Sequence, residues 1–483
     1  MRESGILMHI SSLASPYGIG TMGKAAFEFI DFLKASGQRL WQVLPINPTA
    51  FGNSPYQSPS VFAGNPLLID LDLLKEDGLL ENIDFSGVDF GTNPEKVDFE
   101  KVEATHTKLL KKAFSNFDAN DEYNTFCTEN AQWLNEYAYF SALSNHFDGA
   151  PWQEWDDDAK NYPPDAKYIE KLNTEISFYK FLQFIFDKQW ADIKAYATKN
   201  GVEIIGDLPI YAALNSADVW ANRQLFMLDE DGFPTDVAGC PPDAFSEDGQ
   251  HWGNPLYNWD AIKEQWYNWW IRRIQQYEKM FDWVRIDHFR GFEAFFAIPA
   301  ETQLPKDGRW IKGPGKEFFD AVKLNCKIKI IAEDLGHLTP EVYELLEYCD
   351  FPGMKVLQFA FDPNFDNPYL LHNHPKNSVC YTGTHDNDTC IGWYESETNK
   401  EFIKDYLNVK NDKDVPEAMI KTVLSSPSDL AIIPIQDFLD INIRMNAPST
   451  LNQDNWSFRI KENVLTKKAS ERIYNLTKIY KRI

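Results

Sequence analysis

Residues 283–291 of the 483-residue chain read WVRIDHFRG, an apolar, strand-like run that ends in charged side chains. Arg285 and Asp287 lie two positions apart, so both side chains point to the same side of a strand. A guanidinium beside a carboxylate lowers the pKa of that carboxylate, which suits a nucleophile or a group that stabilises a cation. A structural ion pair at the end of a strand is the other interpretation of these two residues.

Seven more apolar runs of this kind occur along the chain, which makes eight strand candidates in all. They span residues 5–10, 39–44, 202–205, 328–331, 354–359, 378–381 and 431–435. Helical patterns lie between several of them, and those at 23–36 and 175–200 each end at a glycine, a typical stop for a helix. Eight buried strands that alternate with helices predict an α/β fold, a (β/α)₈ barrel, whose active site forms at the C-terminal ends of the strands.

The spacing of the runs predicts one catalytic barrel, residues 1–483, with two long insertions. Residues 47–172 follow the second strand and carry two amphipathic helical patterns, at 94–117 and 129–147. Residues 209–260 follow the third strand and include VAGCPPDAFSEDGQHWGNPLYNW, where glycine and proline predict irregular structure. Both insertions follow strand ends, so we expect them to wall a groove over the active-site face. We expect a closing helix near the C-terminus and no separate C-terminal β domain.

The charge balance excludes several classes of partner. The chain has 47 Lys and Arg against 72 Asp and Glu, a formal charge of −25, so we expect neither nucleic acid nor an anionic membrane surface as a ligand. No apolar run approaches the ~20 residues of a membrane span, and the start has no cleavable signal layout. The 6 cysteines form no C-x-x-C pair, which fits a reducing compartment and predicts a cytoplasmic protein.

Acidic residues also follow three other strand candidates. GDLPIY, IIAEDLG and YTGTHDNDT place there Asp207, Glu333 with Asp334, and His385 with Asp386. Glycoside cleavage needs one ionised carboxylate and one protonated carboxylic acid, and the apolar residues before Glu333 favour the protonated role. The alternatives are a helix cap at Asp334, a polar turn at 385–388 and a structural bond from Asp207. Four acidic sites on four strands favour catalysis or sugar binding.

The same carboxylates are also compatible with a metal-dependent barrel hydrolase. His372 and His374 form a His-x-His pair, but it lies in the loop after the sixth strand, apart from the acids with which it would share a metal. Residues 17–23, YGIGTMG, lack the following Lys-Ser/Thr of a phosphate-binding loop. We therefore expect neither a metal nor a cofactor.

Motifs spread over nearly the whole chain carry a family resemblance. In order they read HISSLASPYGIG, FGNSPYQSPS, FAGNPLLIDL, GDLPIYAALNSADVW, PPDAFSEDGQHWGNPLYNW, RIDHFRGFEAFFAIP, IIAEDLG, QFAFD, YTGTHDNDT and RMNAP. This set resembles the 4-α-glucanotransferases of the amylomaltase, or disproportionating-enzyme, type, glycoside hydrolase family 77 of the α-amylase clan. The resemblance implies transfer of an α-1,4-glucan segment to the 4-hydroxyl of another glucan or of glucose. A hydrolytic glucosidase of the same clan is the alternative.

The resemblance also implies roles for particular residues. Asp287 becomes the nucleophile, Glu333 the general acid/base and Asp386 the group that stabilises the distorted donor sugar. The implied sugar contacts are Ser54, Tyr56, Gln57, Asp207, Arg285, His385, Trp252, Asn254, Phe245 and Asn446. Many relatives read PPD-Tyr-Phe where this chain has Asp243-Ala244-Phe245, so Ala244 removes an aromatic ring from the acceptor side. The expected assembly is a monomer or a homodimer.

Overall fold

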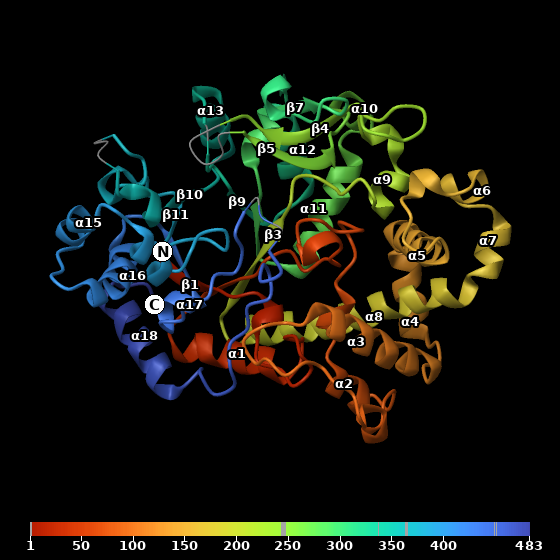
Figure 1. The fold of residues 1–483 in the computed structure, drawn as a ribbon, viewed down its shortest axis with the longest axis horizontal. Helices are drawn as coiled ribbons and strands as arrows, with labels where there is room; N and C mark the ends of the chain where they lie inside the picture. The colour runs from red at the N-terminus through yellow and green to blue at the C-terminus, as the bar shows by residue number, and fades with distance from the viewer. Residues whose placement is uncertain (1, 243–247, 337, 363–365, 449, 451) are drawn as a thin grey trace.

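The barrel predicted from the eight runs is present. The computed structural model describes residues 2–242, 248–336, 338–362, 366–448, 450 and 452–483. Parallel strands close into a barrel in the order β1-β12-β11-β10-β9-β6-β3-β2 (Figure 1). They are β1 (Glu3–Leu7), β2 (Leu40–Gln42), β3 (Glu203–Leu208), β6 (Trp283–Ile286), β9 (Lys329–Ala332), β10 (Gly353–Val356), β11 (Ser378–Tyr381) and β12 (Leu430–Pro434). Each overlaps one predicted run, so the (β/α)₈ fold is confirmed.

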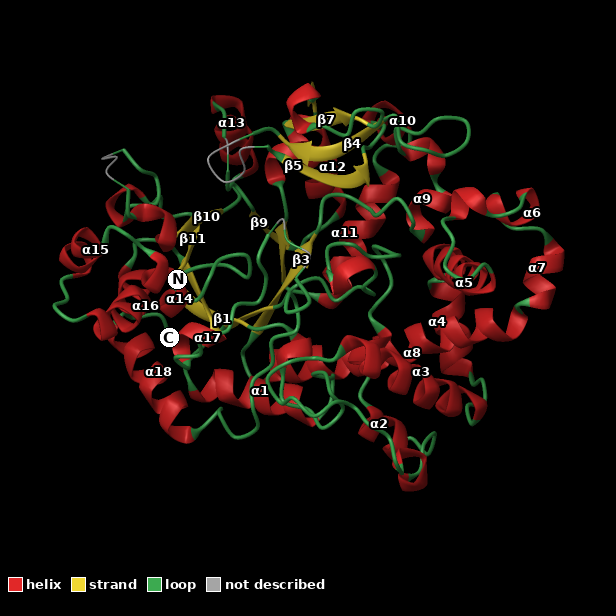
Figure 2. Ribbon diagram, in the orientation of Figure 1, coloured by secondary structure: helices red, strands yellow, loops and turns green. Residues whose placement is uncertain are grey.

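Helices cover the outside of the barrel (Figure 2). They are α1 (Lys24–Ala35), α8 (Asn173–Lys199), α11 (Asn268–Met280), α12 (Gly315–Asn325), α13 (Pro340–Cys349), α14 (Cys390–Ser396), α15 (Lys400–Leu407), α16 (Val415–Ser425), α17 (Ile435–Phe438) and α18 (Lys467–Ile479). The predicted helices at 23–36 and 175–200 correspond to α1 and α8, and the expected closing helix is α18.

The segment between β2 and α8 contains more helices than the two predicted patterns. It holds α2 (Leu71–Glu76), α3 (Phe99–Ser115), α4 (Asp121–Glu129), α5 (Ala131–His146), α6 (Asp157–Lys160) and α7 (Ala166–Lys171). Only α3 and α5 match the predicted patterns, because the others have too few turns to show a helical period. Most of these helices group at one side of the barrel, on the right in Figure 1.

The prediction of irregular structure within 237–259 is wrong in part. Residues on either side of 243–247 form β4 (Asp236–Cys240) and β5 (Gln250–Pro255), and α9 (Ala217–Ala221) and α10 (Trp259–Glu264) flank them. These strands join β7 (Ala294–Pro299) and β8 (Arg309–Lys312) in an antiparallel sheet of order β5-β4-β7-β8. Pairing between β4 and β7 is long-range, so the local glycine and proline content does not reveal it. Among the described residues, no strand follows β12.

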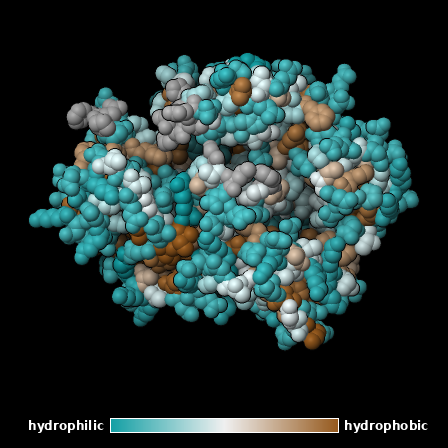
Figure 3. Space-filling view, viewed as in Figure 1, coloured by the Kyte–Doolittle hydropathy of each residue, from teal (hydrophilic) through white to brown (hydrophobic). Residues whose placement is uncertain are grey.

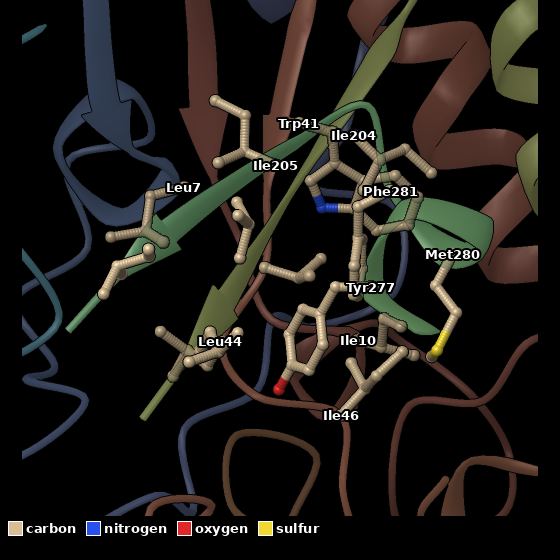
Figure 4. Close-up of a cluster of buried hydrophobic side chains, with 14 of the residues drawn as sticks. Leu7, Ile10, Trp41, Leu44, Ile46, Ile204, Ile205, Tyr277, Met280 and Phe281 are labelled. Carbon is tan, nitrogen blue, oxygen red and sulfur yellow. The ribbon is translucent and has the colours of Figure 1, made fainter. Parts of the chain in front are cut away.

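Large apolar side chains fix the strands that carry the site. Figure 4 shows Trp41 of β2 beside Ile204 and Ile205 of β3, and none of the three has exposed surface. The Trp41 indole also donates a hydrogen bond to the Met8 carbonyl (2.8 Å), so its polar atom is satisfied. Burial of each such side chain stabilises the fold by ~1.5–3 kcal/mol. The core therefore determines where the C-terminal ends of β1, β2 and β3 lie.

The two chain ends lie close together beside the barrel (Figure 1). Arg482 is fully buried and donates hydrogen bonds to the carbonyl oxygens of Glu3 (3.0 Å), Ser426 (3.0 Å) and Ser428 (2.9 Å). The face drawn in Figure 3 is mostly hydrophilic, with small apolar patches. In the described part of the chain, no helix has both the length and the apolar content to cross a membrane.

Candidate active site

A groove of about 590 Å³ opens at the C-terminal ends of the barrel strands. Residues that follow β3, β6, β9 and β11 line it, including Asp287, Glu333 and Asp386. Its other walls come from 52–57 after β2, from 250–254 around β5, and from 446–448, 450, 452–453 and 455–456 after β12. The three carboxylates that are far apart in the sequence therefore meet in one groove.

A chain of charged hydrogen bonds runs across two neighbouring strands to Asp287. Asp207 of β3 and Arg285 of β6 are directly paired in the sheet, and Arg285 Nη1 donates to both carboxylate oxygens of Asp207 (2.8 Å each). Arg285 Nη2 donates to Asp287 Oδ1 at 2.7 Å. The Tyr56 hydroxyl donates to the second oxygen of Asp207 (2.8 Å). Asp287 is thus held by a guanidinium whose own position is fixed by a buried carboxylate.

The expected effect of Arg285 on Asp287 is outweighed. Burial raises the pKa of the Asp287 carboxyl above its ordinary value, Arg285 opposes this, and the negative charge of Asp207 adds to the increase. The prediction of a lowered pKa is therefore wrong, because sequence spacing shows the guanidinium but not the burial. Arg285 still gives Asp287 the adjacent positive charge that favours its ionised form.

Glu333 lies beside Asp287, since Ile286 and Ala332 are partners in the β6–β9 pair and each precedes one of the carboxylates. Its side chain accepts hydrogen bonds from the backbone N–H groups of Leu335 (2.7 Å) and His288 (2.7 Å). The backbone of His288 is left-handed (φ 53°). Burial and the charge of Asp287 raise the pKa of Glu333 to about 7, as the preceding apolar residues predict. Near neutral pH, Glu333 therefore exchanges a proton readily.

Asp386 has the opposite electrostatic environment. His385 Nε2 lies 3.3 Å from Asp386 Oδ2, and Asn446 Nδ2 donates to Asp386 Oδ1 (2.6 Å). Burial acts to raise the pKa of Asp386, but His385 and Asn446 outweigh it and lower the pKa to about 2. Burial acts to lower the pKa of His385, and Asp386 reverses that and raises it. Asp386 is therefore the carboxylate that stays ionised.

Other predicted sugar contacts lie on the opposite wall of the groove. Gln57 Nε2 donates to Asn254 Oδ1 (3.2 Å) and to the Trp252 carbonyl (3.4 Å), which connects the segment after β2 with β5. The Ser54 hydroxyl accepts a hydrogen bond from the Tyr56 N–H (3.3 Å). These residues all line the groove, and the Trp252 ring contacts His288 edge-on at 4.9 Å. Phe245, with Asp243 and Ala244, lies outside the described residues.

Some polar candidates have structural partners instead. Asp334 is no helix cap, since its carboxylate accepts from the Met354 N–H (2.5 Å) and the Lys355 ammonium (3.1 Å). His374 Nε2 contacts the Tyr369 carbonyl (2.8 Å) within its own loop. Within the described residues, no three or more His, Cys, Asp or Glu side chains are grouped so as to hold a metal ion.

Two residues that the sequence did not single out also contact side chains or backbone groups of the site. The Arg444 guanidinium donates to the Asp386 carbonyl, although only Asn446 was selected from the RMNAP motif. Trp456 packs against Tyr56 and His385 at ring-centroid distances of 5.7 and 5.9 Å. Nothing in the local pattern around Trp456 distinguishes it from a core tryptophan.

Comparison with known proteins identifies the family of the chain. A family model described as 4-alpha-glucanotransferase, glycoside hydrolase family 77, matches residues 8–466. The chain belongs to this family. The 4-alpha-glucanotransferase of Streptococcus pneumoniae serotype 4 is 48% identical over 498 residues, which cover 100% of this chain and 98% of that protein. The Thermus thermophilus protein of the same name is 42% identical over 502 residues, covering 100% and 99%.

A solved structure supports the same assignment. Amylomaltase from Streptococcus agalactiae, in complex with acarbose, superimposes with a TM-score of 0.96 at 40% identity, and each chain is covered completely. Family membership confirms the predicted 4-α-glucanotransferase activity, and it supports this prediction over a hydrolytic glucosidase or a metal-dependent hydrolase. A glucan is accordingly the substrate class.

Proposed function

We propose that the groove carries out a retaining double displacement on α-1,4-glucans, with Asp287 as nucleophile and Glu333 as general acid and base. The observation that supports this best is the contrast between the two adjacent carboxylates. Asp287 has the Arg285 guanidinium at 2.7 Å, which stabilises its negative charge. The pKa of Glu333 is raised to about 7 by burial and by Asp287, so it holds a proton that it can donate.

In the first half-reaction, Asp287 attacks C1 of a glucosyl unit while Glu333 donates its proton to the departing 4-oxygen. The C1–oxygen bond breaks, a β-glucosyl ester forms on Asp287, and the remainder of the donor leaves with the proton. Positive charge develops on the ring in the transition state. Asp386, ionised because its pKa is lowered to about 2, provides a fixed negative charge that stabilises it.

In the second half-reaction, Glu333 is ionised and acts as the base. It removes the proton from the 4-hydroxyl of another glucan or of glucose, and that oxygen attacks C1 and displaces Asp287. Two inversions restore the α configuration. A retaining mechanism of this kind predicts that the carboxyl groups of Asp287 and Glu333 lie about 5–5.5 Å apart.

The remaining predicted residues hold the sugars. The set is Ser54, Tyr56, Gln57, Asp207, Trp252, Asn254, Phe245, Arg285, His385 and Asn446. We assign two of the walls around them to the two insertions, residues 47–172 and 209–260, and a third wall to the segment after β12. Amide, hydroxyl and charged groups beside aromatic rings suit a ligand with hydroxyl edges and apolar faces.

Transfer exceeds hydrolysis only if the glucosyl–enzyme survives until a sugar replaces the leaving group. The aromatic side chains around Trp252 and Phe245 are our candidates for the groups that keep water away. Trp252 supports this because it lines the groove next to His288, whose backbone N–H binds Glu333.

Incubation with maltotriose tests the proposal directly. A transferase produces a ladder of longer glucans together with glucose and maltose, and Asp287→Asn serves as the inactive control. Mainly glucose and maltose, without a ladder, would show hydrolysis. Binding of maltooligosaccharides without any product would show a glucan-binding protein and would remove Asp287 from its role.

We further propose that the enzyme works in the cytoplasm, as a monomer or homodimer, without a metal or cofactor. The sparse cysteines, 6 in 483 residues and none in a C-x-x-C pattern, support the compartment. Treatment with EDTA should leave the maltotriose ladder unchanged. Loss of activity that one divalent metal restores would overturn the metal-free mechanism.

A further inference from the structure

Three aromatic rings meet at the edge of the donor site. Tyr56 and His385 stack at a centroid distance of 5.3 Å with 13° between their planes. The Trp456 indole lies against both, at 5.7 Å from Tyr56 and 5.9 Å from His385. We call these three residues the ring cluster. Trp456 is only 7% exposed, so most of its surface is used in packing.

Each partner of Trp456 leads to a carboxylate of the site. Tyr56 donates to Asp207, which binds Arg285, which in turn binds Asp287. His385 pairs with Asp386. The indole therefore contacts Tyr56, which is linked through Asp207 and Arg285 to the proposed nucleophile. It also contacts His385, which pairs with the ionised Asp386.

The backbone of Trp456 adopts a conformation that tryptophan rarely takes. Its φ is 66°, in the left-handed region, and such a residue costs of order 1–3 kcal/mol. The surrounding segment compensates for that cost. The Trp456 N–H donates to the Met445 carbonyl (2.8 Å), and the Asn455 side chain bonds to Ala447 N (3.0 Å) and to the Thr450 carbonyl (3.0 Å).

The segment is also fastened on its other side. The Ile460 N–H donates to the Ser12 carbonyl (2.9 Å), and Arg459 Nη2 donates to the Ser15 carbonyl (2.6 Å). Both acceptors lie in the loop after β1. Hydrogen bonds on both sides thus hold the strained residue with its indole against Tyr56 and His385.

We propose that Trp456 is a positioning residue for the donor site. Its indole keeps Tyr56 on Asp207 and His385 on Asp386, and through them it sets the geometry of Asp287 and Asp386. This role rests on the double displacement proposed above. Removal of the indole leaves a void into which both rings can move, and a misplacement of ~1 Å costs roughly a hundredfold in rate.

The test compares Trp456→Leu and Trp456→Phe with the matched control Trp393→Leu. Trp393 of α14 is similarly buried, at 8% exposed, but its ring contacts are with Phe361 and Tyr394. We expect Trp456→Leu to lower kcat/KM for maltotriose roughly a hundredfold, mainly through kcat, because the reacting groups are misplaced. Trp456→Phe should recover most of the loss, and Trp393→Leu should keep wild-type activity per folded molecule.

A donor with an activated leaving group separates this role from an effect on Glu333. Fluoride leaves α-maltosyl fluoride without needing a proton, so Glu333→Gln should regain formation of the covalent intermediate, here a maltosyl ester of Asp287. Trp456→Leu should stay slow with this donor, because the substitution displaces Asp287 and Asp386, and an activated leaving group does not correct their positions. Trp456→Met has about the same side-chain volume as the Leu variant but a more flexible, unbranched side chain, and it provides the same comparison if the Leu variant does not fold.

Three results would overturn the inference: wild-type kcat in Trp456→Leu, an equal loss in Trp393→Leu, or full rescue by α-maltosyl fluoride. Failure of the proposed function gives a different result, since the wild-type enzyme would then produce no ladder from maltotriose. A ladder from the wild type with unchanged Trp456 variants would reject only the role of Trp456.

Discussion

Asp287 and Glu333 follow adjacent barrel strands at the same level, yet their surroundings differ in kind. Asp287 is bound by a side-chain charge, Arg285, whose other nitrogen is bound to Asp207. Glu333 is bound by two backbone N–H groups, and burial contributes most to raising its pKa to about 7. The comparison teaches that one type of side chain acquires two protonation roles from its environment.

Removal of the nucleophile should have the largest effect on this pair. Asp287→Asn keeps the size and the contact with Arg285 but cannot form the glucosyl ester. We expect turnover of maltotriose to fall by several decades, where each ~1.36 kcal/mol of lost barrier reduction is tenfold. Initial rates measure this loss, and mass spectrometry should detect the glucosyl–enzyme in the wild type but not in the variant. A correctly folded variant with near-normal turnover would end the assignment of Asp287.

Removal of the acid should have a smaller effect that depends on the donor. Glu333→Gln keeps an acceptor oxygen for only one of the two backbone N–H groups and cannot act as a proton donor, so we expect a loss of ~10²–10⁴-fold with maltotriose. Formation of the maltosyl–enzyme from α-maltosyl fluoride should approach the wild-type rate. Equal loss with both donors would contradict the role of Glu333 as proton donor, and the two carboxylates would then no longer differ in function.

Removal of the Asp207 carboxylate, which holds Arg285 in place, should lower the rate by less than either of these substitutions. Asp207→Asn removes the carboxylate that holds the guanidinium, and we expect roughly a hundredfold loss of kcat because Arg285 can then shift from Asp287. Asp236→Asn is the matched control, since Asp236 binds Arg309 through both oxygens on the second sheet. Equal losses in the two variants would mean that the effect is on folding.

A change of pH should have the smallest effect on the rate, and the direction of that effect follows from the protonation of Glu333. Glu333 must be protonated to act, so kcat/KM for maltotriose should fall as the pH rises through about 7, where about half of the enzyme is active. Asp287 must be ionised, and its raised pKa places the acid limb above the ordinary value for Asp. With α-maltosyl fluoride the fall at high pH should disappear. Persistence of that fall would assign the basic limb to another group.

Much of this site was predictable because barrels place chemistry at strand ends. The eight apolar runs, and the acidic residues directly after four of them, were enough to predict Asp207, Asp287, Glu333 and Asp386 as neighbours. The small sheet was missed because β4 pairs with β7, a segment about sixty residues later, and local composition carries no trace of such pairing. The short helices α2, α4, α6 and α7 have too few turns to show a period.

Three features of the site also depend on distant contacts. The direction of the pKa shift of Asp287 is set by burial, which the spacing of Arg285 and Asp287 does not report. Trp456 becomes part of the donor site only because the segment after β12 folds back over Tyr56 and His385. The wall that joins residues 52–57 to β5 depends on the hydrogen bond from Gln57 to Asn254, almost two hundred residues away.

The sequence by itself predicted the barrel, the family and the carboxylates that line one groove. These follow from local apolar runs, from the residues that end them and from motifs that can be read one at a time. Only the tertiary structure decided that burial outweighs Arg285 and raises the pKa of Asp287, which rings pack beside the carboxylates and where the second sheet lies. The physical reason is that burial, electrostatic coupling and ring packing depend on distances between residues far apart in the chain, and those distances exist only after folding.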